Sequence, residues 1–297
     1  LQSTSANANF KLYNNFIHSI LAYGNATLPG QNGIGIALIN GGGYGIYFNS
    51  VNLFTAQTNA SAPSAAIFIG AGITGTASVD IRNNIFSCRR TAGINYAIYC
   101  SVPNIIFSNI NYNDYYVLNS TKYVGFLGSN RTTLANWQAA TGLDGNSVSV
   151  DPIYTSTTDL HLNVISTLND QGSPIAGITT DIDGAARSAT VPDIGADEFT
   201  PPVCSGNTGG TAIADFNTVC SSGTVNLSAS GFSYGLGIAY QWEWSTTSAV
   251  AGFSNIPGET NPTSLNTPTI SVTTWIRLRV TCSAGAPGYS NVIQITV

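Results

Sequence analysis

Gly35-Ile-Ala-Leu38, Ala66-Ile-Phe-Ile69 and Ala97-Ile-Tyr-Cys100 are the three stretches that decide the fold of this chain. Each begins with a small residue and continues with alternating apolar positions, and their starts lie 31 residues apart (66 − 35 and 97 − 66). A period in this range is typical of stacked or solenoid architectures. If successive coils stack in register, their aliphatic side chains form an internal column with one residue every ~4.8 Å. The repeat therefore predicts a parallel β-helix, which the general rule for parallel crossovers makes right-handed.

A second repeat follows each stretch by about 20 residues and places an Asn or Asp at one corner of the coil. Its members are Asn52, Asn84 and Asp114, and Asn15 holds the same place in a coil already under way at the N-terminus. Stacked amides can hydrogen-bond to their neighbours above and below, as in cross-β stacks. We therefore expect a structural ladder of these four side chains within coils that occupy residues 1–130, N-terminally truncated from a longer protein.

The repeat ends where a helical pattern begins, at residues 132–142. Thr132 and Thr133 can cap the start of a helix, Leu134 and Trp137 lie one turn apart, and Gly142 can close the last turn. The core of a solenoid is open at its end and must be covered. This segment therefore predicts a short capping helix.

The composition excludes several classes of partner. Only 8% of the residues are charged, against a typical quarter, and the formal net charge is −5 with nine Lys and Arg. Nine scattered cations cannot form a phosphate-binding stripe, so we expect no nucleic-acid partner. No apolar run reaches the ~18 to 20 residues of a membrane span, so we expect a chain that does not span a membrane. Hydroxyl- and amide-rich β-surfaces suit this composition.

The coils lack the acids that catalysis on a polysaccharide needs. Glycoside hydrolysis requires two carboxylates ~5 to 9.5 Å apart, whereas the coil region holds only Asp80 and Asp114. We expect Arg82, Arg89 and Arg90 to lie at a solvated corner of the coil near Asp80. His161 could be a base oriented by Asp159, but no Ser or Cys nucleophile motif accompanies it, so a structural role is expected. The sequence therefore predicts no catalytic residues, no cofactor and no enzyme activity.

A set of short motifs follows the predicted helix in a fixed order. It resembles the C-terminal end of bacterial surface β-helix proteins of the choice-of-anchor or right-handed β-helix repeat class, and its members are Asp151-Pro-Ile-Tyr154, Asp159-Leu-His-Leu162, Gln171-Gly-Ser-Pro174, Asp181-Ile-Asp-Gly184, Arg187 and Asp193-Ile-Gly-Ala-Asp-Glu-Phe199. The resemblance implies that residues 131–200 form a C-terminal cap on a β-helix. It also implies secretion.

The same motifs contain the densest acidic cluster of the chain, for which two interpretations stand. Asp181 and Asp183, followed by Gly184, alternate as in a calcium loop and are candidate ligands of a structural calcium ion. The favoured alternative is structural: Arg187 pairs with one or two of the carboxylates, and bonds from side chains such as Asp193 to the backbone pin the cap. An EF-hand is excluded because the twelfth position from Asp181 is Pro192.

The pattern after Pro201-Pro202 changes to short strands separated by turn residues, at 224–230, 238–244, 269–273, 275–282 and 291–297. About 95 residues in this arrangement, with Trp242 as a core residue, predict an Ig-like β-sandwich over residues 203–297. The Tyr240-Gln-Trp242 strand resembles Ig-like modules of large secreted proteins of Bacteroidota. That group often carries type IX secretion cargo and gliding or attachment adhesins.

The cysteine pattern favours disulfides over metal binding. There are five cysteines and no C-x-x-C motif, so zinc sites are disfavoured and one thiol at least stays outside any intramolecular pairing. In the sandwich, strand direction favours Cys204 with Cys282 over Cys220 with Cys282. Cys88 and Cys100 form either a bridge or a pair of buried thiols.

Taken together, these features predict an all-β protein of two parts, extracellular and at the cell surface. We expect a non-enzymatic adhesin or stalk fragment whose extended surface binds glycans or other cell-surface or secretion components. Sugar-stacking candidates are the tyrosines after the last coil, for which core or cap packing is the alternative: Tyr112, Tyr115, Tyr116 and Tyr123. Two further alternatives remain, a polysaccharide lyase or hydrolase with its site in upstream coils, and a purely structural spacer.

Overall fold

The computed structural model describes residues 1–21, 32–55, 63–91, 93–118, 122–282 and 285–297. The chain forms two compact units, residues 1–200 and residues 201–297. One α-helix of eight residues is present among the described residues, and the other regular elements are strands and short turns of helix, so the fold is all-β as predicted.

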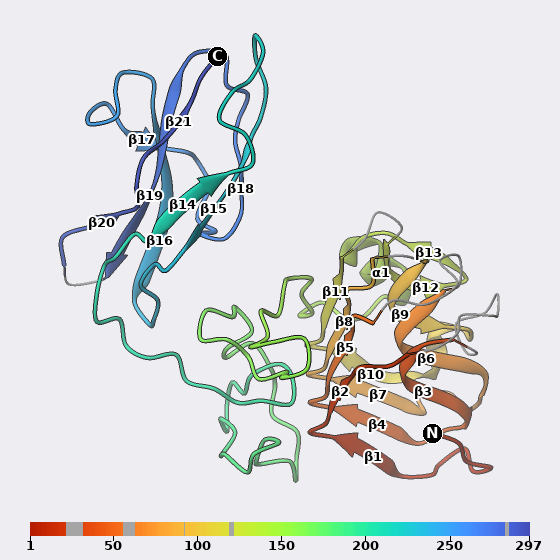
Figure 1. The fold of residues 1–297 in the computed structure, drawn as a ribbon. Helices are drawn as coiled ribbons and strands as arrows, with labels where there is room; N and C mark the ends of the chain where they lie inside the picture. Colours follow the sequence, from red (N-terminus) through yellow and green to blue (C-terminus); the bar gives the residue numbers. More distant parts are fainter. Residues whose placement is uncertain (22–31, 56–62, 92, 119–121, 283–284) are drawn as a thin grey trace. The chain divides into compact units, whose positions relative to one another are not determined.

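The first unit contains a parallel β-helix built from three sheets that the chain visits in rotation (Figure 1). Sheet 1 contains β1 (Phe10–Tyr13), β4 (Tyr44–Tyr47), β7 (Val79–Arg82) and β10 (Phe107–Asn111). Sheet 2 contains β2 (Phe16–His18), β5 (Ser50–Leu53), β8 (Ile85–Cys88) and β11 (Asp114–Val117). Sheet 3 contains β3 (Ile34–Gly41), β6 (Ser64–Ile73), β9 (Asn95–Cys100), β12 (Lys122–Leu127) and the antiparallel edge strand β13 (Ser129–Arg131).

The predicted internal column is confirmed in sheet 3. Ile36 pairs in register with Ile67 and Ile67 with Ile98, and all three side chains are at most 3% exposed. The next inward position is filled in the same way by a second column, Leu38, Ile69 and Cys100. Alternation along each strand therefore directs one set of aliphatic residues into the coil interior.

An asparagine ladder also exists, but two of its four members differ from the prediction. The side-chain Nδ2 of Asn15 donates to Oδ1 of Asn49 (2.8 Å), Asn49 to Asn84 (2.9 Å) and Asn84 to Asn113 (3.0 Å). The rungs are thus Asn49 and Asn113, where we expected Asn52 and Asp114. The reason is that the rungs follow the repeat motifs at unequal distances, 14 residues after Gly35 (49 − 35), 18 after Ala66 (84 − 66) and 16 after Ala97 (113 − 97), so a constant offset misplaces two of them.

The two displaced residues point outward from sheet 2. Asn52 donates to the backbone oxygen of Thr157 (3.1 Å). Asp114 is fully buried and accepts from the backbone N–H of Val150 (3.0 Å). Both therefore hold the chain that covers sheet 2 and take no part in the ladder.

The predicted capping helix is α1 (Leu134–Thr141). Thr133 accepts a hydrogen bond from the Asn136 N–H, and Gly142 ends the helix with φ 68°. Trp137 is fully buried against the core of the coils, and its Nε1 donates to Oδ2 of Asp144 (2.7 Å). Gly125 of β12 leaves room for this ring, since a Cβ there would lie 2.5 Å from Trp137 Cε3. The helix therefore covers the last coil.

The rest of the predicted cap lies elsewhere. Residues 145–199, here called the flank segment, run along the side of the coils over the outer face of sheet 2 (Figure 1). Two small apolar clusters attach it, one of Ile85 with Leu162, Leu168 and Ile194, the other of Tyr47 and Phe48 with Ile175 and Ile178. Strands β5 and β8 are consequently buried on both faces. The prediction of an end cap over 131–200 was therefore correct only for α1.

The second unit consists of two antiparallel sheets. One contains β14 (Thr211–Ala214), β15 (Asn226–Ser230) and β18 (Leu265–Asn266). The other contains β16 (Ile238–Ser245), β17 (Ser254–Asn255), β19 (Thr274–Cys282), β20 (Gly288–Tyr289) and β21 (Ile293–Ile295). The expected strand at 269–273 is absent and only Ile270 forms an isolated bridge, to Gly223.

The core of the second unit follows the predicted alternation. Ile276, Leu278 and Val280 of β19 are fully buried, and Trp242 of β16 is buried with its Nε1 donating to the Asn261 oxygen (2.7 Å). The predicted disulfide between Cys204 and Cys282 is present, and its alternative with Cys220 is excluded. Cys88 and Cys100 are buried free thiols.

Candidate functional site

The outer face of sheet 1 carries a polar surface that is exposed at β1. The alternation that turns Leu12, Ile46 and Ile81 inward turns their neighbours outward in two columns. One column is Lys11, Gly45 and Asp80, and the other is Tyr13, Tyr47 and Arg82. The flank segment covers sheet 2 and reaches Tyr47 at the edge of this face, but it leaves β1 of the first coil uncovered, where Lys11 and Tyr13 are exposed.

The centre of this face is an ion pair with an aromatic neighbour. Arg82 donates from Nε and Nη2 to the two oxygens of Asp80 (2.8 and 2.7 Å). Tyr47 donates its hydroxyl to Asp80 Oδ2 (3.0 Å), and the Arg82 guanidinium lies 5.5 Å from the centre of its ring. Burial first and the Asp80 charge second raise the pKa of Tyr47 to about 12. The phenol therefore stays a neutral hydrogen-bond donor.

A missing side chain shapes the groove beside this pair. A Cβ at Gly45 would lie 2.5 Å from Tyr47 Cε2, so only glycine allows the tyrosine ring to lie across the strand. The groove has a volume of about 330 Å³, and Asn9, Phe10 and Lys11 form part of its wall. Phe10 and the neighbouring Tyr13 are 42% and 45% exposed. Asp80 is the only carboxylate among the described residues that line the groove.

This arrangement differs from the predicted solvated corner. Arg82 and Asp80 belong to the sheet face, whereas Arg89 pairs with Asp151 of the flank segment and lies over the ring of Tyr116 (4.8 Å). Arg90 is fully buried and donates to the Ile20 oxygen (2.8 Å). The three arginines therefore lie in three different environments, although they are close together in the sequence.

The predicted tyrosine cluster is likewise dispersed. Tyr115 is fully buried and donates its hydroxyl to Asp144 (2.6 Å). Tyr116 stacks under Arg89, and Tyr123 stacks on Tyr96 (5.3 Å between ring centres) on the outer face of sheet 3. Tyr115 and Tyr123 therefore serve packing. The exposed aromatic residues of the candidate site, Phe10 and Tyr13, lie instead in the first coil, where the repeat motif gave no signal for them.

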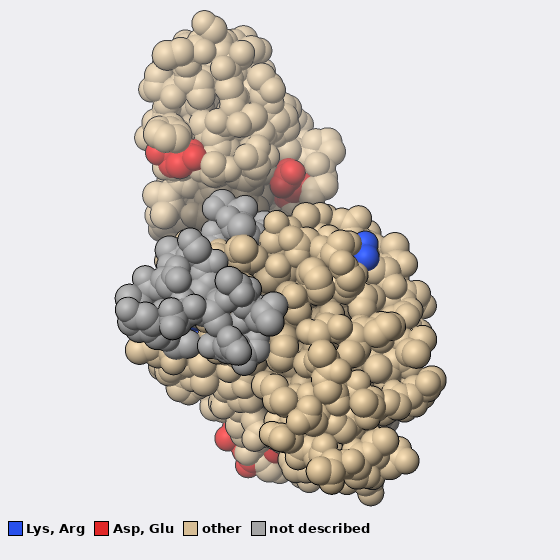
Figure 2. All heavy atoms as spheres, turned by 90° about the vertical axis from the view of Figure 1, so that its right-hand side faces the viewer, with Lys and Arg blue, Asp and Glu red and all other residues tan. Residues whose placement is uncertain are grey.

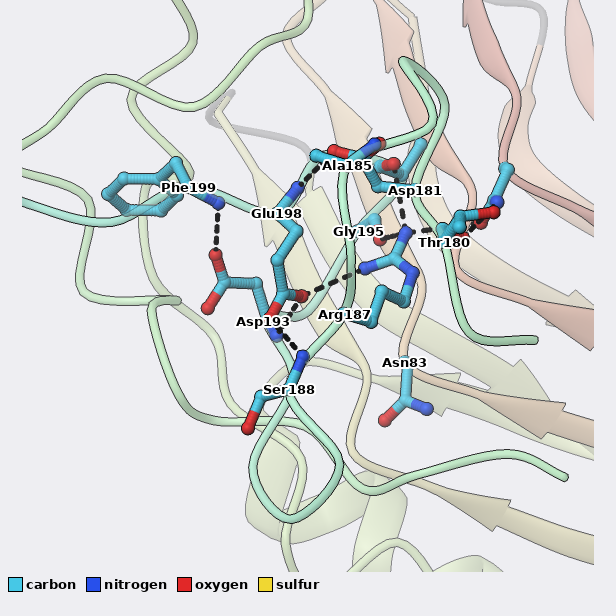
Figure 3. A network of polar contacts seen from close by, with 12 residues as sticks. Asn83, Thr180, Asp181, Ala185, Arg187, Ser188, Asp193, Gly195, Glu198 and Phe199 are labelled. Atoms are coloured by element: carbon cyan, nitrogen blue, oxygen red, sulfur yellow. Dashed lines mark hydrogen bonds and ion pairs between the residues drawn. The ribbon is translucent and has the colours of Figure 1, made fainter.

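The acidic cluster of the flank segment is organised around Arg187 (Figure 3). Arg187 pairs with Glu198 (3.2 Å), as the structural interpretation predicted, and donates to the backbone oxygens of Gly195 and Ala196 (3.1 and 2.9 Å). Its guanidinium also lies 4.0 Å from the centre of the Phe48 ring and reaches Oδ1 of Asn14 (3.1 Å). This one side chain thus fixes the flank segment to the first two coils.

Asp181 and Asp193 bind backbone N–H groups in the same network (Figure 3). Asp193 accepts from Asp170 (2.7 Å) and Phe199 (2.8 Å), and burial raises its pKa to about 7. Asp181 accepts from the N–H groups of Asp183 and Ala185 on Oδ1 and of Glu198 on Oδ2. Both oxygens of Asp181 therefore accept backbone hydrogen bonds, as the favoured structural interpretation predicted. Asp183 instead contacts His161.

Comparison with known proteins gives one family match. Residues 208–297 match a family model described as a domain of unknown function, DUF8696. This span lies within the second unit, so the match concerns that unit alone. We found no match to the chain among curated proteins or solved structures. Among the described residues no helix is long and apolar enough to cross a membrane.

Proposed function

We propose that this chain is part of a secreted cell-surface protein that binds glycans through the outer face of sheet 1 and does not cleave them. The observation that carries the proposal is the groove lined by Asp80 and Tyr47, with Arg82 paired to Asp80, exposed Phe10 in the wall of the groove, and exposed Tyr13 at the outward position next to Tyr47. The second unit, for which the strand pattern supports an Ig-like sandwich, acts as a spacer.

The groove offers the two kinds of contact that a sugar needs. A pyranose ring has apolar C–H faces, which pack on aromatic side chains such as Phe10 and Tyr13, and hydroxyl edges. The hydroxyls can bond to the Asp80–Arg82 pair, and bonds to charged groups are about twice as strong as neutral ones. Amide side chains such as Asn9 add both donors and acceptors. The combination supports recognition of neutral or weakly charged glycans.

The surface chemistry and the disulfide support a place outside the cell. Disulfides persist in oxidising compartments and are rare in cytosolic proteins, and the Cys204–Cys282 bond is formed here. Figure 2, turned so that the right-hand side of Figure 1 faces the viewer, shows only scattered Lys, Arg, Asp and Glu atoms on its visible surface. The motif resemblance of residues 151–199 supports secretion in the same way.

The absence of an acid pair supports binding without cleavage. Hydrolysis requires a second carboxylate ~5 to 9.5 Å from the first, and Asp80 is the only acid among the described lining residues. Asp80 is also already paired with Arg82 through both oxygens.

The test is a glycan array with the purified chain, followed by calorimetric titration of the best ligand. Phe10→Ala and Tyr13→Ala should each weaken binding about fivefold or more, because a lost aromatic platform is worth at least ~1 kcal/mol. The matched controls are Phe216→Ala and Tyr234→Ala in the second unit, which are also exposed and should bind normally.

Three results would contradict the proposal. Binding to no glycan would favour a structural spacer, and binding unchanged in both groove variants would place the site elsewhere. Release of unsaturated or reducing-end products from acidic polysaccharides, with or without a chelator, would favour the lyase or hydrolase alternative.

A further inference from the structure

His161, Asp183 and Asp197 bring three potential ligand atoms together on the flank segment. A ring nitrogen of His161 and one oxygen from each aspartate all lie within 4.8 Å of one another. The three residues come from separate stretches that the fold joins: the Leu162 N–H donates to Asp197 Oδ2 (2.8 Å), and the Ile182 N–H donates to the Ala196 oxygen (3.0 Å). The constellation is therefore fixed by backbone contacts and is independent of the sheet 1 groove.

The imidazole of His161 is oriented as in a metal site. Its Nδ1 bonds to the carboxylate of Asp159, which leaves Nε2 facing Asp183 Oδ2 (2.7 Å). The ring of Phe16 packs edge-on against it, 4.9 Å between centres. Metal-binding histidines almost always donate their second ring N–H to a carboxylate, carbonyl or water, which fixes the tautomer and the ring orientation. Asp159 holds that position here.

Asp197 leaves one carboxylate oxygen open to a ligand in this cluster. It is only 6% exposed, its Oδ2 accepts from Leu162, and no described residue donates to Oδ1. The carboxylates of Asp181 and Asp183 are its acidic neighbours. A buried carboxylate with one open oxygen and two acidic neighbours gains strongly from a bound cation.

We propose that His161, Asp183 and Asp197 bind a divalent transition-metal ion of the Zn²⁺ class, with Asp159 orienting the histidine. Imidazole and carboxylate ligands suit Zn²⁺, whereas Ca²⁺ takes six to eight oxygen ligands. Bonds of ~2.0 to 2.2 Å in a tetrahedral site place ligand atoms about 3.4 Å apart. The side chain of Asp183 is 60% exposed and can rotate to open this space.

Binding would replace the proton that now lies between His161 and Asp183. The metal takes the lone pair of Nε2, and any proton on that nitrogen passes to solvent. The three ligands then join the stretches around residues 161, 183 and 197 next to Phe16 of β2. The ion would thus cross-link three stretches of the flank segment, and the affinity should rise with pH because protons compete for the histidine and its facing carboxylates.

The experiment titrates ZnCl₂ into the whole chain by calorimetry, after chelator treatment and without a polyhistidine tag. All proteins carry Cys220→Ser, because Cys220 is an exposed free thiol that could bind zinc by itself. Co²⁺ replaces Zn²⁺ in a second series, in which tetrahedral coordination gives visible absorption. The test variants are His161→Gln and Asp183→Asn, and the controls are His18→Gln, the other histidine, and Asp170→Asn, an exposed acid of the flank segment.

The expected result is one Zn²⁺ per chain and a rise of about 5 to 10 °C in the melting temperature of the first unit at a hundredfold excess over Kd. The variants His161→Gln and Asp183→Asn should each show no such rise in melting temperature and should bind Zn²⁺ at least tenfold more weakly. Both controls should show the same rise and the same affinity as the parent protein. The proposal is overturned if the parent protein binds no Zn²⁺, if His161→Gln binds as the parent does, or if Ca²⁺ binds more tightly than Zn²⁺.

Discussion

Asn49 donates from Nδ2 to Oδ1 of Asn84 at 2.9 Å, and the backbone N–H of Asn49 donates to the same oxygen at 3.0 Å. Asn84 in turn donates to the backbone oxygens of Ile46 and Arg82 and to Oδ1 of Asn113. Both asparagines are fully buried. This rung therefore supplies hydrogen-bond partners to buried polar groups at the turn between sheets 1 and 2 in three consecutive coils.

Asn84→Ala should lower the free energy of unfolding of the first unit by about 3 kcal/mol or more, because it leaves several buried polar groups without partners and each costs ~1 to 3 kcal/mol. The measurement is urea unfolding followed by circular dichroism. Asn52→Ala is the control: it removes one bond to Thr157 and a long one from the Ser87 hydroxyl (3.4 Å) and should cost about 1 kcal/mol. Equal losses in the two variants would contradict the central role of the ladder.

This pair of asparagines also shows which features of the coils could be predicted from the sequence. Ladder formation itself was predictable, because a corner amide that recurs in a solenoid has few other roles. The register of the ladder was not predictable, because the distance between consecutive rungs varies from 29 to 35 residues and Asn52 lies only three positions beyond the true rung, Asn49. The residue before each rung has a positive φ, as at Phe48 (49°) and Asn83 (60°), a feature that sequence alone does not display.

The flank segment and the candidate sites were harder to predict for a related reason. Strand alternation reports which side chains face inward, and it correctly placed Ile36, Ile67 and Ile98. It says nothing about an irregular segment that folds back over a sheet, because that segment has no period. The contact of His161 with Asp183 depends on this path.

Trp137 is the side chain that seals the last coil. Trp137→Ala should destabilise the first unit by about 3 to 5 kcal/mol, the usual cost of truncating a buried tryptophan. Gly125→Ala should also destabilise it, because the new methyl group would lie 2.5 Å from Trp137 Cε3. Scanning calorimetry measures both, with Gly128→Ala as a contrast in which the added Cβ has open space but a positive φ. A Gly125→Ala variant as stable as the parent would show that the helix can move aside.

The stability of the first unit should fall as pH rises from about 5 to about 8. Burial raises the pKa of Asp193 from 3.8 in the unfolded chain to about 7 in the fold, so its stabilisation is complete below 3.8 and is lost as pH rises through about 7. A shift of this size corresponds to about 4 kcal/mol. Burial also raises the pKa of Asp114 and Asp144, which adds to the same trend.

Urea unfolding at pH 5 and pH 8 measures this change. Asp193→Asn should flatten the pH profile while it lowers stability at pH 5, because an amide can accept only one of the bonds from Asp170 and Phe199 without turning a donor toward the other. A parent profile that is flat or rises over this range would show that the two backbone bonds outweigh the burial of the carboxyl group.

The disulfide should stabilise only the second unit. It joins residues separated by 78 positions, and a loop of that length adds roughly 4 kcal/mol by restricting the unfolded chain. Reduction, or the double change Cys204→Ser with Cys282→Ser, should therefore lower the melting temperature of residues 201–297 by roughly 15 °C or more. The first unit should be unaffected, because burial raises the pKa of its thiols to about 12 for Cys88 and about 11 for Cys100 and makes them poor nucleophiles. Calorimetry with and without reductant separates the two transitions, and Cys220→Ser should leave both in place. A reductant-sensitive first transition would mean that Cys88 and Cys100 are joined in solution.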